Sequence, residues 1–240
     1  MSHPNGSAEF VYEHLREQIL QWRLPPGAAV REAHVAEELG VSRTPVRAAL
    51  QRLQLEGFLA ARGKRGLQAP RWTLEELEET YRLRAHLEEW VGASAAQRRE
   101  RLDLPRLHRL ADEMTALAEQ AEVDLERIAA LNVEFHDTIL NELGNARLRQ
   151  LMSNVVVLPL LYRVFHLRTE AEMKTTLVEH HTLLLAIEQG DAQWAGSLSR
   201  AHILGALAAV VRGGIYETKS DRKPRSMRSA TNHTETENSQ

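Results

Sequence analysis

Hydrophobic residues at helical spacing begin close to the N-terminus of the chain. Val11, Leu15 and Ile19 fall on one face of a helix. The run Leu24-Pro25-Pro26-Gly27 ends this helix, because proline cannot continue one. A short second helix is predicted over 31–39, with Gly40 as its stop signal. The pattern therefore predicts two helices within the first 40 residues.

A third helix follows directly. Its apolar face consists of Val46, Leu50 and Leu53. Either Ser42 or Thr44 can cap its start, and Pro45 is tolerated in its first turn. After this helix, two short apolar runs flank a basic, glycine-rich turn, a pattern typical of a β-hairpin. Three helices followed by a hairpin predict a winged helix-turn-helix.

The rest of the chain shows helical periodicity and no strand alternation, so it predicts an all-α bundle of about six helices. Pro159 lies inside the fourth of these and is expected to kink it. The fold class is therefore mainly α. The expected helix spans are 74–101, 105–121, 123–142, 145–167, 170–189 and 191–212.

Prolines, glycines and changes in composition divide the chain into five segments. A winged helix-turn-helix and an all-α effector-binding and dimerisation domain are separated by a linker. Flexible or disordered segments, poor in residues that can form a core, are expected at both ends. The expected segments are 1–9 (flexible N-terminus), 10–70 (winged helix-turn-helix), 71–75 (linker), 76–212 (helical domain) and 213–240 (disordered tail).

Charge sharpens this division. The whole chain carries a formal net charge of −3, but residues 40–72 alone carry +6, and residues 73–212 carry −7. A basic segment beside an acidic one indicates two parts with different partners. Taken alone, the overall charge of −3 argues against a general nucleic-acid binder. The basic segment restores DNA as a partner.

The third helix presents the chemistry that DNA recognition needs. Arg43 and Arg47 lie one turn apart on the face opposite the apolar stripe, where arginine can form paired hydrogen bonds with guanine. Ser42, Thr44 and the helix N-terminus suit phosphate oxygens. In the wing, Lys64, Arg65 and Gly66 are expected to reach the minor groove or the DNA backbone. A charge run alone is more often a solvated surface, but the order of elements favours DNA.

This region resembles the DNA-binding domain of GntR-family transcription regulators. The resemblance covers about residues 10–70. It rests on Ser42-Arg43-Thr44-Pro45-Val46-Arg47 and on the downstream Ala49-Leu50-x-x-Leu53-x-x-Glu56-Gly57. It implies contacts with double-stranded operator DNA from Arg31, Arg43, Arg47 and the wing at Gly66.

Histidines carry the candidate chemistry of the helical part, which holds seven of the chain's eleven. Three of them, His136, His180 and His202, interrupt or border core-facing stripes on three different helices. A buried histidine costs desolvation unless it is paired. A single one is more often a hydrogen-bonded core residue than a ligand. Three together favour a divalent cation, with His181 as a neighbouring donor.

The same region is similar to the FadR-type ligand-binding domain that follows this DNA-binding domain in one branch of the GntR family. The resemblance rests on Arg84-x-x-Leu87-Glu88, on Asn132-x-x-x-His136 and on the 22-residue separation of His180 and His202. It implies a metal held by Asn132 and the three histidines. One amide oxygen and three imidazoles suit zinc, nickel, iron or manganese better than calcium.

The resemblance also implies a small effector molecule. A carboxylate can fill metal positions that the protein leaves open, and Arg84 can pair with it through two hydrogen bonds. An equally good interpretation of Arg84 is an ion pair with a glutamate inside the bundle. The main hypothesis is therefore a transcription regulator, a repressor rather than an enzyme, that forms a homodimer and responds to a small carboxylate.

Two alternatives share the same residues. In the first, the cation itself is the signal and the chain is a metal sensor. In the second, His136-Asp137 and His180-His181 belong to a helical metal-dependent phosphohydrolase, which lacks a fitting upstream histidine and late aspartate. The chain has no cysteine, so disulfides and cysteine-based metal or nucleophile chemistry are excluded. Without a signal peptide or a long apolar run, we expect a cytoplasmic protein with no membrane partner.

Overall fold

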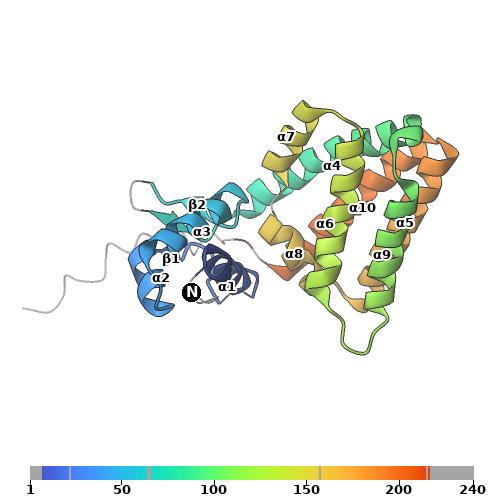
Figure 1. Cartoon of the computed structure of the whole chain (residues 1–240). Helices are drawn as coiled ribbons and strands as arrows, with labels where there is room; N and C mark the ends of the chain where they lie inside the picture. The colour runs from blue at the N-terminus through green and yellow to red at the C-terminus, as the bar shows by residue number, and fades with distance from the viewer. Residues whose placement is uncertain (1–6, 22, 64–65, 157, 215, 217–240) are drawn as a thin grey trace, which may run out of the picture.

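The computed structural model describes residues 7–21, 23–63, 66–156, 158–214 and 216. In Figure 1 the blue and cyan N-terminal elements form a small unit beside a larger bundle of helices, and α4 runs from one into the other. The mainly α fold class, with a small antiparallel sheet, is confirmed. The small unit contains α1 (Ala8–Leu20), β1 (Ala29–Val30), α2 (Glu32–Glu38), α3 (Arg43–Leu55), β2 (Ala60–Ala61) and β3 (Leu67–Gln68).

The small unit has the three helices and the hairpin that its sequence predicts. Its apolar stripes meet in one core, with Val11, Val46 and Leu53 fully buried. The hairpin strands β2 and β3 pair antiparallel, and β1 adds a third strand to give the order β1-β3-β2. Ser7 caps α1 by accepting a hydrogen bond from the Phe10 amide, so the first helix starts within the segment predicted to be flexible.

In the described part of the chain, seven α-helices and one 3₁₀ turn form the larger part. They are α4 (Leu74–Gln97), η2 (Arg99–Arg101), α5 (Leu104–Ala118), α6 (Leu125–Glu142), α7 (Ala146–Val155), α8 (Leu158–Leu167), α9 (Glu170–Gln189) and α10 (Ala192–Gly213). A capping box fixes the start of α4, since Thr73 and Glu76 bond reciprocally to each other's backbone amides. This start lies inside the predicted linker 71–75.

The predicted kink at Pro159 is wrong in its detail. The segment 145–167 forms two helices, because Val156 leaves the helical conformation and ends α7. Pro159 then lies in the first turn of α8, where a missing amide hydrogen costs no helical bond. The bundle accordingly has one more helix than expected. Likewise, the predicted helix 74–101 ends at Gln97 and continues only as the short 3₁₀ turn.

Close packing of α4 against α10 organises the bundle. A Cβ on Gly92 would lie 2.7 Å from the Ala195 carbonyl oxygen, and one on Gly196 would lie 2.9 Å from the Glu89 carbonyl oxygen. Only glycine therefore permits this approach of the two backbones. α10 is also long and apolar enough to cross a membrane, but half of that stretch is buried in the bundle, as in an ordinary core helix. α7 and α8 would pass the same test only if they were joined across their 58° bend.

The two parts contact each other through α8. The guanidinium of Arg16 on α1 lies 4.7 Å from the ring centroid of Tyr162 on α8, and 5.7 Å from that of Phe58 in the small unit. Figure 1 shows α8 at this junction, next to α1. The end of α3 also faces the bundle, where Leu55 and Glu56 line a cavity together with bundle residues.

Candidate functional site

Three helices bring His136, His180 and His202 together inside the bundle. They come from α6, α9 and α10, and one ligand nitrogen from each lies within 4.8 Å of the other two. In a tetrahedral zinc site with bonds of about 2.1 Å, two ligand nitrogens lie about 3.4 Å apart. Side-chain movements of up to about 1 Å would therefore close this cluster on an ion.

The hydrogen bonds of His180 leave one nitrogen facing an oxygen. Its Nδ1 lies 2.8 Å from the Thr176 carbonyl oxygen, and its Nε2 lies 3.0 Å from Oδ1 of Asn132. Burial lowers the pKa of His180 well below its usual value, so the ring carries one proton at neutral pH. If Nδ1 holds that proton for Thr176, the Nε2 lone pair faces the Asn132 oxygen lone pairs. A cation between the two atoms would turn this repulsion into coordination by both.

His136 also has a ring nitrogen that is free to bind a metal. Its Nε2 is buried and has no hydrogen-bond partner among the described residues. Burial, together with the neighbouring His202 and His180, lowers the pKa of His136 well below its usual value. The ring is therefore neutral at pH 7, which is the form that binds metals. A buried polar atom without a partner is rare in proteins and calls for a ligand, such as an ion.

His202 is oriented by an acidic partner. Its Nδ1 lies 2.8 Å from Oε2 of Glu179, and this carboxylate holds the proton on Nδ1 and leaves Nε2 as the coordinating atom. Sequence reasoning missed Glu179. Its only signal was its place next to His180. His181, expected as a neighbouring donor, instead lies 3.2 Å from the Thr115 hydroxyl and outside the cluster.

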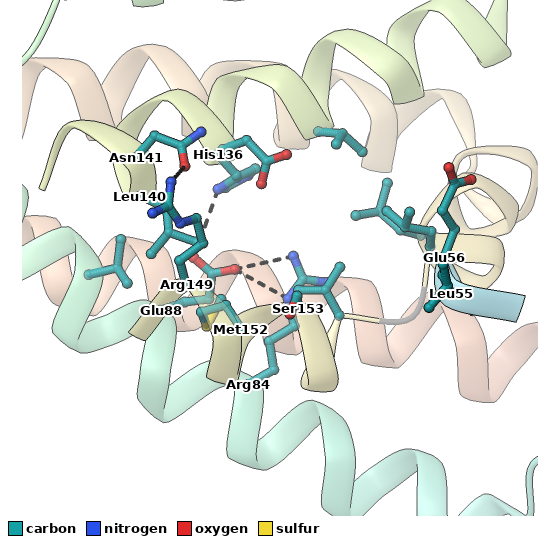
Figure 2. A pocket seen from close by; sticks show the side chains of 16 residues that line it. Leu55, Glu56, Arg84, Glu88, His136, Leu140, Asn141, Arg149, Met152 and Ser153 are labelled. Carbon is teal, nitrogen blue, oxygen red and sulfur yellow. Dashed lines mark hydrogen bonds and ion pairs between the residues drawn. The ribbon is translucent and has the colours of Figure 1, made fainter. Parts of the chain in front are cut away.

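Arg84 forms the buried ion pair that was the second interpretation of this residue. Its Nε and Nη2 both lie 3.2 Å from one oxygen, Oε1 of Glu88, one turn further along α4. The other Glu88 oxygen, Oε2, lies 3.9 Å from Nδ1 of His136. Figure 2 shows this chain from Arg84 through Glu88 to His136. The pair therefore stands directly beside the histidine cluster.

A cavity of about 480 Å³ opens on the other side of this pair. Of the predicted site residues, Arg84 and His136 line it, whereas Asn132, His180 and His202 do not. Leu55 and Glu56 also line it, from the end of α3 in the small unit (Figure 2). The cavity thus lies between the histidine cluster and the end of the helix predicted to read DNA.

Four of the predicted DNA-contacting residues lie at the starts of α2 and α3. Arg31 is the N-cap of α2, Ser42 is the N-cap of α3, and Arg43 and Thr44 are in the first turn of α3. All four are exposed. The Ser42 hydroxyl makes no capping hydrogen bond, so its expected role as a cap is not seen. The start of α3 therefore exposes unused backbone amides and hydroxyls beside arginines, an arrangement suited to phosphate oxygens.

Arg47 is exposed but paired. Its Nε and Nη2 donate to the two carboxylate oxygens of Glu32 at 3.1 and 3.0 Å. This hydrogen bond raises the pKa of Arg47 and lowers that of Glu32. The pair joins α2 to α3, and sequence reasoning did not anticipate it, because the two residues are fifteen positions apart.

The wing is described only in part. Gly66 is exposed and has φ +104°, a conformation that other residues rarely adopt. Glycine is therefore needed here for its backbone angle, since a Cβ would meet only the Val30 carbonyl oxygen at 3.7 Å. Lys64 and Arg65 lie outside the described residues.

Two family matches cover most of the chain. Residues 7–68 match the family described as "Bacterial regulatory proteins, gntR family", and residues 79–205 match "FCD domain". The boundary between them lies at the start of α4, where the small unit meets the bundle.

Proteins similar to this chain are also transcriptional regulators. The chain is 28% identical to the "Probable D-xylose utilization operon transcriptional repressor" of Paenarthrobacter nicotinovorans, over 87% of this chain and 91% of that protein. It is 28% identical to the "HTH-type transcriptional regulator McbR" of Escherichia coli K12, over 76% and 83%. The solved structure of E. coli McbR/YncC covers 86% of this chain and 98% of that one, with 26% identity and a TM-score of 0.68.

The phosphohydrolase alternative is therefore rejected, because the matched families and relatives are transcriptional regulators and not enzymes. DNA binding by this family agrees with the exposed arginines at the start of the third helix of the winged helix. The chain belongs to the GntR family of bacterial DNA-binding transcriptional regulators, with an N-terminal GntR helix-turn-helix domain followed by an FCD domain.

Proposed function

We propose that the chain is a repressor whose operator affinity is controlled by a small carboxylate, bound at a divalent transition metal in the FCD domain. Asn132, His136, His180 and His202 hold the metal, which is zinc, nickel, iron or manganese. The buried, unpartnered Nε2 of His136 carries this proposal. The approach of His180 Nε2 to the Asn132 side-chain oxygen, at 3.0 Å, supports it independently.

The donor set determines the character of the site. Three neutral imidazoles and one neutral amide bring no negative charge to a bound dication, and the nearby carboxylates of Glu179 and Glu88 contact the imidazole rings and not the ion position. A bound dication therefore keeps a net attraction for an anion. A carboxylate is the simplest such ligand, and Arg84 stands nearby as a second positive group. Glu88 holds Arg84 until the effector competes for it.

Repression requires a two-fold operator to be read by two winged helices. We propose that the FCD domains form the homodimer and that each small unit places α3 in a major groove. Arg31, Arg43, Arg47 and the wing residues Lys64, Arg65 and Gly66 then contact DNA. The relative named as a repressor supports the sign of regulation. We place the protein in the cytoplasm, with its operator, and not at a membrane.

We further propose that the functional division follows the predicted segments. Residues 10–70 bind DNA, residues 76–212 bind the effector and dimerise, and 71–75 connects them.

Metal content tests the first part of this proposal. Elemental analysis of purified protein is expected to find about one equivalent of a transition metal per chain, and His136→Ala is expected to lose it. His108→Ala is the matched control, because His108 is a surface histidine paired with Glu188. Metal-free protein after purification and after reconstitution with each of the four metals would contradict the proposal.

Effector binding and DNA binding test the rest. Small carboxylates are expected to raise the melting temperature of metal-loaded protein, in proportion to their binding, and to change operator affinity in a gel-shift assay at fixed salt. Arg43→Ala is expected to abolish specific operator binding without unfolding the protein. Unchanged operator binding by this variant would contradict the assignment of α3.

The metal sensor remains as a second candidate, because it uses the same four ligands. The two functions differ in one comparison. A sensor changes operator affinity between its metal-free and metal-loaded forms without any carboxylate, whereas the proposed repressor needs the carboxylate as well.

A further inference from the structure

The C-terminal segment of the chain carries a dense group of basic residues. Residues 217–240 lie outside the described part of the structure, and the two family matches end before them, at residues 68 and 205. Between residues 219 and 228 the sequence holds five basic residues against one acidic residue, Asp221, which gives a net charge of +4. The basic residues are Lys219, Arg222, Lys223, Arg225 and Arg228. Their density exceeds that of residues 40–72, where a net charge of +6 is spread over 33 positions.

The segment follows a point where the bundle meets the winged helix. α10 ends at Gly213, where a Cβ would lie 2.6 Å from Cδ2 of Leu167 at the end of α8. Arg212 secures this contact, because its Nη2 donates to the Leu167 carbonyl oxygen at 2.9 Å and to Oε2 of Glu172 at 2.7 Å. Figure 1 shows this end of α10 beside α8, on the side of the bundle that faces the small unit. The chain therefore leaves the bundle close to the DNA-binding domain.

Tyr216, the last described residue, lies at the same junction. It is partly buried against a hydrophobic cluster that contains Leu77 and Tyr81 at the start of α4. Trp72, four residues after the end of β3, packs against the same cluster. The described chain thus ends beside the segment that joins the winged helix to the bundle.

The surface predicted to bind DNA is within reach of this point. α3 has 13 residues and is about 20 Å long. Its last residue borders the bundle, whereas its first residue is Arg43. An extended chain covers at most about 3.4 Å per residue, so Arg222 lies up to about 20 Å and Arg228 up to about 40 Å from Tyr216. The basic residues therefore have enough chain to reach DNA at the start of α3.

The acidic bundle and the DNA are the two partners that such a segment could contact. Surface glutamates of the bundle already pair with arginines, among them Glu113 with Arg127 and Glu134 with Arg106. B-DNA carries one negative charge per about 1.7 Å of helix axis, and basic side chains that bind it release condensed counterions. The observations therefore favour DNA.

We propose that residues 219–228 form a second DNA-binding segment, whose basic side chains contact the phosphate backbone of the DNA held by the winged helix. Contacts with phosphates carry no direct sequence information, so the segment adds affinity for any sequence, whereas α3 and the wing discriminate between sequences. This role is independent of the metal and of the effector. It gives a chain with a net charge of −3 a second source of attraction for DNA.

Gel shifts at a series of salt concentrations test this proposal. The probes are an operator selected from random duplexes by the original full-length protein, and an unrelated duplex. The variant Arg222→Gln/Lys223→Gln/Arg225→Gln/Arg228→Gln is expected to bind both probes about tenfold more weakly, with an unchanged ratio of the two affinities. The slope of log affinity against log salt is expected to decrease by about 0.9 for each lost phosphate contact. Arg222→Lys/Arg225→Lys/Arg228→Lys keeps the charge and is expected to keep the affinity.

Two further variants separate the position of the charges from the net charge. A chain that ends at Tyr216 loses five basic and four acidic residues, so its net charge changes by one unit. It is nevertheless expected to lose as much affinity as the glutamine variant. The matched control replaces four arginines of the bundle by glutamine and is expected to bind both probes as the original protein does. These four are exposed and make no ion pair among the described residues: Arg99, Arg101, Arg109 and Arg147.

The outcomes are distinct from those for the winged helix. Unchanged affinity of the glutamine variant for both probes would overturn the proposal, and so would a higher affinity, which would place the segment on the acidic bundle. An equal loss in the bundle control would show a general effect of charge and would also overturn it. Arg43→Ala tests the winged helix separately, because it is expected to lose the preference for the operator and to keep the salt-dependent binding that residues 219–228 add to any duplex.

Discussion

In the histidine cluster, the contact made by one ring nitrogen determines which nitrogen is left to bind a metal. His180 is held by the Thr176 carbonyl, and His202 is held by Glu179. The helical period predicts that His136, His180 and His202 face the core, but it cannot predict Glu179, because that contact depends on how α9 packs against α10. Arg84 shows the same limit. Its spacing from Glu88 allowed an ion pair or a free anion site, and only the fold shows the pair.

Glu179 offers a prediction at this scale. Glu179→Gln is expected to lower metal affinity by about 10- to 100-fold, because His202 loses the carboxylate that fixes its tautomer. A chelator competition measures the change. Glu188→Gln is the control, since Glu188 makes a similar contact with His108 at the surface. Equal metal affinities in the two variants would contradict the role of Glu179.

The Tyr12–Glu56 hydrogen bond gives a second prediction at the scale of single residues. Tyr12 is buried, and burial together with this bond raises the pKa of its hydroxyl. Tyr12→Phe leaves Glu56 without this donor and is expected to lower the free energy of unfolding by about 1.5 kcal/mol. Denaturant titration measures it. Tyr162→Phe serves for comparison, because the Tyr162 hydroxyl makes no hydrogen bond among the described residues; an equal loss there would show that the bond contributes nothing specific.

At the scale of helices and strands, the prediction was correct where local sequence signals agreed with the packing. The three helices and the hairpin of the winged helix were predictable, since their caps, apolar stripes and glycines are all local. The break between α7 and α8 was not, because a proline inside a periodic stretch fits either a kink or a new first turn. Packing of α8 against α1 and α6 accompanies the second outcome. The strand β1 escaped prediction because two residues carry no periodic signal.

The pairing of α2 with α3 yields a prediction for DNA binding. Glu32→Gln is expected to raise operator affinity several-fold, because it frees Arg47 and removes a negative charge from the DNA-facing surface. Gel shifts at fixed salt measure this. Glu37→Gln, on the same short helix, controls for net charge alone. Lower affinity in Glu32→Gln would instead mean that the pair positions Arg47 for its contact.

The whole molecule combines a basic DNA-binding domain with an acidic FCD domain, as the charge distribution indicated. Its assembly is open to direct measurement. Light scattering on the purified protein is expected to give twice the 27.2 kDa chain mass, because a two-fold operator needs two winged helices. The same mass is expected for the Arg43→Ala variant, since we propose that the FCD domains form the dimer. A 27.2 kDa particle that still binds its operator with full affinity would contradict the dimer.

The sequence by itself determined the order of helices, the winged helix and the four residues proposed as metal ligands, because these depend on local periodicity and on motifs. Tertiary structure alone decided which residues complete the site. Glu179 beside His202, Glu88 between Arg84 and His136, and Leu55 at the cavity are separated in sequence from the residues they serve. Such contacts follow from how helices pack against one another, and the pattern along a single helix carries no record of that packing.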